Sequence, residues 1–317
     1  PPFKNHADYS QRFLDDALWN KVLAEILPAL DRDPGAFERC RTGSAIVYRS
    51  ATEVFKLFDP LWPEEFGREQ GGLRHFQHLD IPVPKLIETG RFEHSDYLLM
   101  SRLPGQSVGA VWSQMSPAQQ TYCIASIGQL MEQLHAQPAS SDPAFALDWP
   151  DFVQQRCQRF AQQQRQNGLA DRWAERLEHW LLEHIETLPH TPSKLLHCDL
   201  TSDHFLVSPH PGSDPGAADY WRLSGLIDFG DAMNGHPLYE FCAPFVSLTQ
   251  GQTQLRRQFL LAYGFTADEL NADLSQQLFC TLLLHRFLNI PYYFKVFFES
   301  EPTSIKALSD YFCGLEA

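Results

Sequence analysis

Two stretches of the sequence determine the predicted fold, and in each an apolar run leads into an acid. The first is Leu195-Leu196-His197-Cys198-Asp199-Leu200-Thr201-Ser202-Asp203-His204-Phe205-Leu206-Val207, and the second is Leu226-Ile227-Asp228-Phe229-Gly230-Asp231. The pair Leu195-Leu196 predicts a short buried strand that leads into a loop, and 205–207 and 223–227 predict strands on either side of a turn. We therefore expect Asp199 and Asp228 to lie near each other at the mouth of a small sheet.

The composition describes an ordinary globular protein that is large enough for two lobes. The chain has 317 residues, of which 44% are hydrophobic and 20% charged. Its formal net charge of −14 argues against a nucleic-acid partner, because the phosphates of a nucleic acid would be repelled.

The seven cysteines are scattered, odd in number and without a C-x-x-C pair. This pattern favours reduced thiols over a disulfide framework or a zinc site, and it predicts a cytoplasmic protein. Residues 1–8 contain no apolar signal core. The apolar stretch 282–298 is interrupted by Arg286 and Lys295, so we interpret it as a core helix and expect no membrane partner.

The first hundred residues predict a helix followed by a sheet. Residues 9–30 have the spacing of an amphipathic helix, and 45–49 and 53–58 have the character of strands. Lys56 lies between apolar neighbours in the second of these strands, which is an unusual position for a lysine. It is either an edge-strand lysine that faces solvent or a buried functional group.

A helix over 64–79 follows, and its Glu69 either pairs with Lys56 or is an ordinary solvated acid. Two more strands are predicted at 85–90 and 97–101, and then strand patterns stop. Helices are predicted over 117–136, 151–166, 170–187 and much of the chain after 237, where aromatic and aliphatic residues supply the core: Phe241, Phe245, Phe259, Leu260, Tyr263, Leu278, Leu282 and Phe287. The predicted division is a first lobe over 1–100, a hinge over 101–106 and a second lobe over 107–317.

This order of parts resembles the protein-kinase-like fold, and its motifs resemble the aminoglycoside phosphotransferase and choline kinase branch of that fold. The branch carries H-G-D-x-x-x-x-N, then I-D-(F/W), then G-x-P. The corresponding segments here are His197–His204, Ile227–Phe229 and Gly235–Pro237, with further matches at Phe66–Glu69 and Leu134-His135. The resemblance covers roughly residues 40–265. It implies an α+β protein with a small N-lobe built on an antiparallel sheet and a larger, mostly helical C-lobe.

The resemblance also implies a role for particular residues around a bound nucleotide, ATP or GTP. Lys56 would hold the α- and β-phosphates and pair with Glu69. Met100 and its neighbours would offer main-chain groups to the base. Ser44, beside Gly43, would lie in a turn that covers the phosphates.

The same resemblance assigns the chemistry to the two acids. Asp199 would orient or deprotonate the acceptor hydroxyl, and Asp228 would bind a Mg²⁺ or Mn²⁺ ion that bridges the phosphates. The N-lobe would therefore bind nucleotide, and the C-lobe would carry catalysis and the acceptor. Phosphoryl transfer needs little beyond charge neutralisation and a positioned acceptor oxygen, which these residue types supply.

The sequence departs from the family motif at two positions. Cys198 replaces the usual glycine, a position that need not contact substrate. His204 replaces the asparagine that would hold the second metal. A neutral imidazole can ligate a metal, although magnesium prefers oxygen, so His204 is either a ligand or a residue that only hydrogen-bonds within its loop.

We therefore predict an ATP-dependent phosphotransferase that acts on a hydroxyl of a small molecule, such as an aminoglycoside-like compound, an amino alcohol, an amino acid or a sugar. Acids such as Asp148, Asp151 and Glu240 could attract a cationic acceptor. The alternative is a catalytically weak or inactive pseudokinase that binds nucleotide or ligand. A third reading takes His197, Asp199 and another histidine as the facial triad of a non-haem iron oxygenase, but such a triad needs an all-β barrel, and long helices flank this motif.

Overall fold

The computed structural model describes residues 6–41, 43, 45–78 and 82–316. Contacts divide the chain into two compact units. The first contains residues 1–105 together with 224–232, and the second contains 106–223 and 233–317. The segment that carries Asp228 thus belongs to the first unit, whereas Asp199 belongs to the second.

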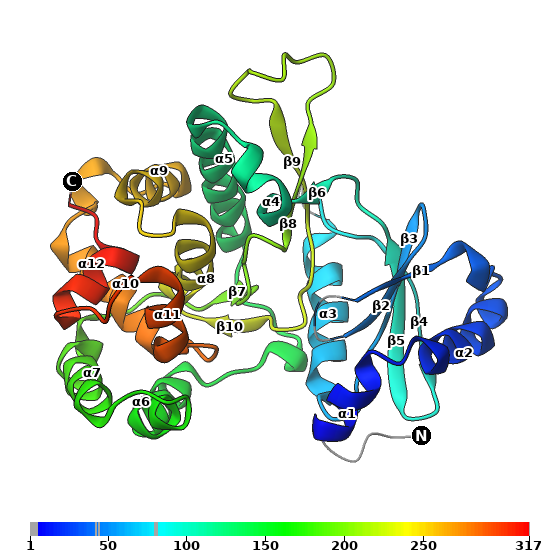
Figure 1. Ribbon diagram of the computed structural model, residues 1–317, viewed down its shortest axis with the longest axis horizontal. Helices are drawn as coiled ribbons and strands as arrows, with labels where there is room; N and C mark the ends of the chain where they lie inside the picture. The colour runs from blue at the N-terminus through cyan, green and yellow to red at the C-terminus, as the bar shows by residue number, and fades with distance from the viewer. Residues whose placement is uncertain (1–5, 42, 44, 79–81, 317) are drawn as a thin grey trace. The chain divides into compact units, whose positions relative to one another are not determined.

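The first unit is a five-stranded antiparallel sheet with helices packed against it (Figure 1). Its strands follow the spatial order β1-β2-β3-β5-β4. Their bounds are β1 Glu38–Cys40, β2 Ile46–Arg49, β3 Glu53–Leu57, β4 Leu86–Phe92 and β5 Ser95–Ser101. The helices are α1 His6–Phe13, α2 Asp16–Ile26 and α3 Pro63–Phe76, with short 3-10 turns at Leu27–Leu30 and Pro34–Ala36.

The alternation of side chains along β3 creates two different faces of this sheet. Phe55 and Leu57 join the hydrophobic core under α1 and α2, with Trp19 and Leu23 from α2. Lys56 points to the opposite face, where α3 supplies Glu69. Because β3 lies between β2 and β5, the edge-strand interpretation of Lys56 is wrong.

The predicted single helix over 9–30 is divided into α1, α2 and a 3-10 turn. The side chain of Asp15 causes the first break, since it caps α2 by accepting a hydrogen bond of 3.0 Å from the Leu18 amide. The spacing of apolar residues does not reveal this break, because a cap changes the path of the backbone without changing which residues face the core.

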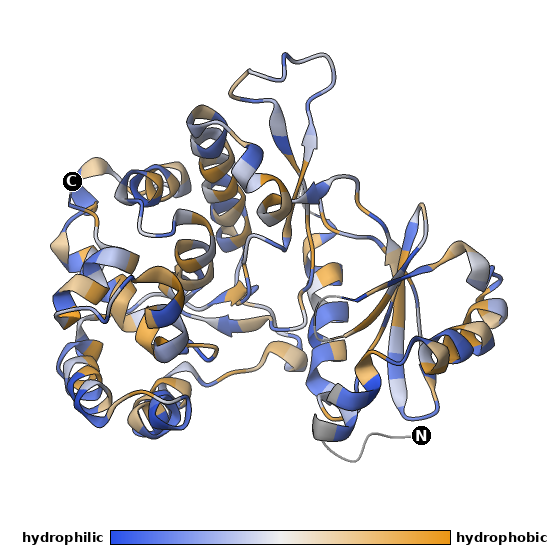
Figure 2. Ribbon diagram, in the orientation of Figure 1, coloured by the Kyte–Doolittle hydropathy of each residue, from blue (hydrophilic) through white to orange (hydrophobic). Residues whose placement is uncertain are grey.

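The second unit is mostly helical, as the sequence predicted. Its helices are α4 Val108–Val111, α5 Pro117–Ala136, α6 Trp149–Gln166, α7 Asp171–His184, α8 Cys242–Pro244, α9 Thr253–Tyr263, α10 Ala272–Leu284, α11 Ile290–Phe297 and α12 Ile305–Cys313. Shorter 3-10 and π turns lie at Trp112–Gln114, Pro143–Phe145, Ile185–Thr187, Pro237–Phe241, Phe245–Thr249 and Ala267–Glu269. Figure 2 shows hydrophobic and hydrophilic residues alternating around these helices, as expected for helices that bury one face.

Two small sheets present the loops of the second unit. Strand β7 (Lys194–Leu196) pairs with β10 (Met233–Gly235), and β6 (Gln106–Ser107), β8 (Phe205–Pro209) and β9 (Trp221–Leu226) form a three-stranded sheet. Strands β8 and β9 form the long hairpin beside α5 in Figure 1, and β9 continues into the first unit. The loop that carries Asp199 lies between β7 and β8.

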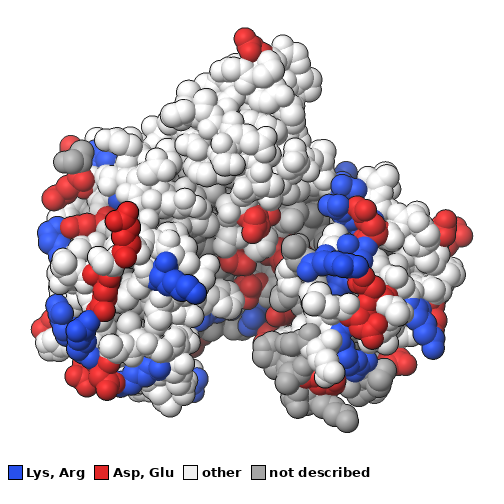
Figure 3. Space-filling view, viewed as in Figure 1, with Lys and Arg blue, Asp and Glu red and all other residues white. Residues whose placement is uncertain are grey.

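The predicted core helix over 282–298 is in fact two helices, because α10 ends at Leu284 and α11 begins at Ile290. Phe287, between them, is 52% exposed and does not belong to the core. Within the described residues, no helix is both long enough and apolar enough to cross a bilayer. The seven cysteines are free thiols, and all except Cys40 are buried. Figure 3 shows charges of both signs interspersed on the visible face of each unit, with few around the β8–β9 hairpin.

Candidate active site

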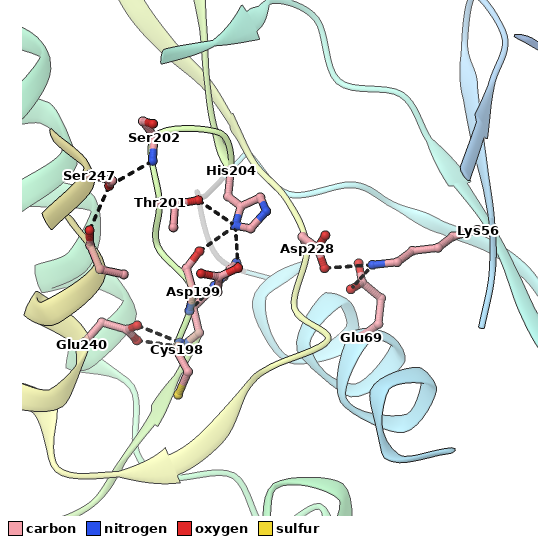
Figure 4. Close-up of polar contacts among 12 residues, drawn as sticks. Lys56, Glu69, Cys198, Asp199, Thr201, Ser202, His204, Asp228, Glu240 and Ser247 are labelled. Carbon is pink, nitrogen blue, oxygen red and sulfur yellow. Dashed lines mark hydrogen bonds and ion pairs between the residues drawn. The ribbon is translucent and has the colours of Figure 1, made fainter. Parts of the chain in front are cut away.

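The cluster in the first unit is built around the Lys56 ammonium. Its Nζ donates to Glu69 Oε2 at 3.1 Å and to Asp228 Oδ1 at 2.8 Å, as Figure 4 shows. Lys56 is 5% exposed and Glu69 1%, whereas the Asp228 side chain is 44% exposed. Burial acts to lower the pKa of Lys56, but the charges of Asp228 and Glu69 outweigh it and hold the pKa above its ordinary value. The lysine is therefore a permanent cation beside a solvent-accessible carboxylate.

Phe229 holds Asp228 against α3. Its ring is fully buried and packs on Phe76, with ring centroids 5.4 Å apart. This packing requires Gly72, since a Cβ there would lie 2.6 Å from the Phe229 Cβ. Asp228 itself has a φ of +72°, a left-handed conformation that aspartate tolerates better than most residues. The D-F-G sequence thus places one carboxylate beside Lys56 and buries the neighbouring ring.

Glu65 lies one turn before Glu69 on α3, and the sequence analysis did not single it out. Burial raises the pKa of its carboxyl group to about 7, helped by the negative charges of Asp231 and Asp228 and opposed by Lys56. Half-buried acids near other acids cannot be recognised from sequence, because the pattern gives residue types but not their spatial neighbours.

The loop of the second unit that carries Asp199, residues 197–204, is held mainly through its main chain. Both oxygens of the Glu240 carboxylate accept from the loop, Oε2 from the His197 amide at 2.6 Å and Oε1 from the Cys198 amide at 2.8 Å. Further along, the Ser202 amide donates to the Ser247 hydroxyl at 3.2 Å. Figure 4 shows these contacts fixing the loop on either side of Asp199.

Glu240 is 1% exposed, so its suggested role in attracting a cationic acceptor is wrong. Burial by itself would raise the pKa of this carboxyl group. His135, whose Nε2 lies 3.7 Å from Glu240 Oε2, and the loop amides that donate to the carboxylate reverse that effect and lower the pKa, so the group stays ionised. Asp148 accepts a hydrogen bond from the Asp151 amide as the N-cap of α6, and the suggested role of these two acids in attracting an acceptor stays a prediction. The motif match at Gly235–Pro237, three residues before Glu240, was the sequence signal that could have identified Glu240 as a support of the loop.

His204 approaches Asp199 on the same loop. Its Nδ1 lies 2.6 Å from the Asp199 carbonyl oxygen and 3.5 Å from Asp199 Oδ2. Because a carbonyl oxygen only accepts, Nδ1 carries a proton and donates, and the lone pair of a neutral ring is then on Nε2. Any metal bound by His204 would have to bind there.

The remaining predicted residues are less directly informative. Met100 lies in β5 between β3 and β4, and the next two amides are occupied, Ser101 by the Lys85 carbonyl and Arg102 by that of Thr52. The contact of Met100 with the base stays a prediction, as does the proximity of Asp199 and Asp228. Ser44 lies outside the described residues.

Comparison with known proteins identifies the family of the chain. The model of the APH phosphotransferase enzyme family matches residues 44–272, so the chain belongs to this family. A comparison with curated protein sequences finds no match.

Several solved structures share the fold. Aminoglycoside phosphotransferase APH(3'')-Id from Streptomyces rimosus is 17% identical with a TM-score of 0.60, over 83% of this chain and 97% of that one. The aminoglycoside-3'-phosphotransferase of type VIII is 21% identical with a TM-score of 0.60, over 84% and 99%. An APH(2'') enzyme in complex with GDP and kanamycin is 17% identical with a TM-score of 0.62, over 78% and 81%. These matches confirm the predicted kinase-like α+β fold.

Proposed function

We propose that this phosphotransferase moves the γ-phosphate of ATP to a hydroxyl group of a small molecule. The observation that carries the proposal is the buried Lys56 ammonium, held between Glu69 and the exposed carboxylate of Asp228. A protein rarely buries a lysine without a use for its charge, and here one carboxylate partner is accessible from solvent. A triphosphate would find a fixed cation beside an acid suited to a metal ion.

A magnesium or manganese ion fits the residues present if the nucleotide supplies most of its ligands. Among the described residues, no group of three or more His, Cys, Asp or Glu side chains forms a ready-made metal site. Magnesium is commonly held by one or two carboxylates together with substrate phosphates, and Asp228 offers such a carboxylate. The ion, when bound, would neutralise charge on the phosphates. His204 Nε2 is the candidate second protein ligand.

Asp199 is the proposed acid–base group for the acceptor. Its own amide donates to His197 Nδ1 at 3.3 Å, and its carbonyl accepts from the Thr201 amide at 2.8 Å. The main chain on both sides of the residue is therefore fixed, and the half-buried carboxylate can orient a hydroxyl or take its proton.

The acceptor is proposed to be a hydroxyl-bearing small molecule of the aminoglycoside, amino alcohol, amino acid or sugar type. Two of the structural neighbours hold streptomycin with ADP or ATP, and another holds kanamycin with GDP. These complexes support testing aminoglycosides first and testing GTP beside ATP.

The alternative function is that of a pseudokinase, and one observation supports this alternative. His204 Nδ1 is engaged with the Asp199 carbonyl, so the histidine can serve the loop without binding metal. If it is a ligand, manganese should equal or exceed magnesium in supporting turnover, and His204→Asn should restore a preference for magnesium. An identical metal ranking in both proteins would assign His204 to the loop.

The proposed function is tested by measuring ADP release from ATP and from GTP with each metal across a panel of hydroxyl-bearing metabolites and aminoglycosides. We expect at least one acceptor to stimulate release and to gain a phosphate by mass spectrometry. Nucleotide binding in a thermal-shift titration without any transfer would favour the pseudokinase. The absence of both nucleotide binding and phosphate transfer would overturn the proposal.

A further inference from the structure

The bend of the 197–204 loop is held at Ser202 through both of its main-chain polar groups. The Ser202 amide donates to the Ser247 hydroxyl oxygen at 3.2 Å, and the Ser202 carbonyl accepts from the Gly109 amide at 2.9 Å. Figure 4 shows the Ser247 contact at this bend, between Asp199 and His204 along the chain. Both partners lie outside the loop, so they fix Ser202 relative to the body of the second unit.

The Ser247 hydroxyl is itself oriented for this contact. It donates to the Ala243 carbonyl at 2.8 Å, so its lone pairs remain for the Ser202 amide. Ser247 lies in a short π-helical turn, Phe245–Thr249, in which Leu248 and Thr249 are fully buried. Such turns are rare and are often found at functional sites. The hydroxyl therefore has a fixed direction and a well-anchored backbone.

Gly109 contacts the other side of the bend through its main chain. It lies in the first turn of α4, where the N–H groups have no partner within the helix, and the Ser202 carbonyl satisfies this one. A Cβ on Gly109 would lie 2.9 Å from Ser202 Oγ and 2.6 Å from Asp203 Oδ1. The helix therefore approaches the loop so closely that no side chain fits between them without a shift.

The second half of the loop depends on these outside contacts for its position. Its other printed contacts are internal to the loop. The Asp199 carbonyl accepts from the Thr201 amide at 2.8 Å and from His204 Nδ1 at 2.6 Å, and the His204 amide donates to the Thr201 carbonyl at 3.1 Å. Contacts within a loop fix its shape but not its place in the unit. The grip on Ser202 supplies that place.

We propose that Ser247 is a positioning residue, whose hydroxyl fixes the second half of the loop and so sets the placement of His204 and Asp199. This inference rests on the proposed function, because the placement of Asp199 matters only if that residue acts on an acceptor. Ser247 acts through the Ser202 main chain and need not touch nucleotide or acceptor.

The test compares Ser247→Ala with Ser247→Thr. Alanine leaves the Ser202 amide without its acceptor, and we expect kcat to fall by about fivefold, the equivalent of one hydrogen bond. KM for ATP should change by less than about twofold, because the proposed nucleotide-binding residues Lys56 and Asp228 belong to the first unit. Threonine keeps the hydroxyl and should restore kcat to within about twofold of the parent value.

Threonine is a suitable rescue because the same turn already contains one in this arrangement. Thr249 Oγ1 donates to the Phe245 carbonyl, four residues earlier, at 2.8 Å, just as Ser247 donates to Ala243. A loss of kcat that threonine does not rescue would show that the volume of the side chain matters rather than its hydroxyl, and would overturn the proposal. So would an unchanged kcat in Ser247→Ala.

Ser126→Ala is a matched control. Ser126 is also half-buried in a helix, α5, and its hydroxyl donates to the Tyr122 carbonyl four residues earlier at 2.9 Å. The control thus removes the same group and the same contact within a helix. We expect kcat to be unchanged in Ser126→Ala. An equal loss in Ser126→Ala and Ser247→Ala would contradict a specific role for Ser247.

A second measurement separates this inference from the proposed function. Hydrogen exchange of the Ser202 amide requires no acceptor and no turnover. We expect exchange about fivefold faster in Ser247→Ala than in the parent protein and in Ser247→Thr. The Cys198 amide, held by Glu240, should be unchanged and is the internal control. If this pattern appears in a protein that transfers no phosphate, the loop contact stands and the proposed function fails. Unchanged exchange at Ser202 would overturn the loop contact itself.

Discussion

In the first unit the charges of Lys56, Glu69 and Asp228 are held by one another, whereas in the second unit the loop of residues 197–204 is held through its main chain. Lys56 makes two ion pairs, and loss of any member leaves a buried charge behind. The peptides on either side of Asp199 are fixed by hydrogen bonds from the loop amides to Glu240 and Ser247. Substitutions in the first cluster should therefore change stability and nucleotide binding together. In the loop, stability and turnover should be separable.

The largest expected effect is that of Lys56→Ala on stability. Because Glu69 is 1% exposed, it would lose its cation while still buried, and we expect the free energy of unfolding to fall by about 3 kcal/mol. Adding Glu69→Gln should recover much of that loss, because it removes a buried charge that Lys56 no longer neutralises. Denaturant unfolding of the two variants measures this, with the exposed Lys21→Ala as control. If the double variant is no more stable than Lys56→Ala, loss of the ion pair is not the cause of the lower stability.

Asp199→Asn should change turnover and not stability, the opposite of Lys56→Ala. We expect turnover to fall on the order of 10²-fold, the range for a positioned acid–base group, with the unfolding midpoint unchanged. Steady-state kinetics beside thermal unfolding checks both parts, and Asp203→Asn, at an exposed position of the same loop, is the control. Normal turnover in Asp199→Asn would remove this residue from the chemistry.

Glu240→Ala tests the main-chain support directly. The His197 and Cys198 amides would lose their acceptor in a buried site, which should cost about 1–3 kcal/mol of stability. Turnover should fall as well, because the loop would no longer be fixed ahead of Asp199. Glu132→Ala, at an exposed position of α5, is the control. Equal unfolding midpoints for the two variants would contradict this role for Glu240.

The smallest expected effect is a pH-dependent one at Glu65. Its pKa of about 7 in the folded protein exceeds the ordinary value of 4.5, so the folded state retains a proton that the unfolded chain releases within this window. Stability contributed by the protonated form is complete below about pH 4.5 and is lost as the pH rises towards 7.

Glu65→Gln mimics the protonated form. It should match the parent protein near pH 4.5 and exceed its stability at pH 8, by about 1 kcal/mol after allowance for the solvent screening of a half-exposed side chain. Unfolding curves across this pH range measure the difference, with the exposed neighbour Glu64→Gln as control. A constant offset at all pH values would show that titration of Glu65 is not its cause.

The sequence predicted those features that depend on local pattern. The lysine among apolar neighbours in β3 marked Lys56, and the spacing of the helix that follows brought Glu69 opposite it. The sequence could not predict that an isolated charged side chain is buried, and so Glu240 was interpreted as a surface acid. Backbone conformation was equally hidden, since nothing in the residue type of Cys198 indicates a positive φ.

We propose that Lys56 and Asp228 bind the nucleotide, whereas Asp199 acts on the acceptor. The most direct test is a calorimetric titration of ATP with magnesium into the parent protein, Asp199→Asn, and the Lys56→Ala/Glu69→Gln variant. We expect Asp199→Asn to bind ATP as the parent does, and the Lys56→Ala/Glu69→Gln variant to bind at least tenfold more weakly. Equal affinity in all three proteins, or loss of affinity in Asp199→Asn, would contradict it.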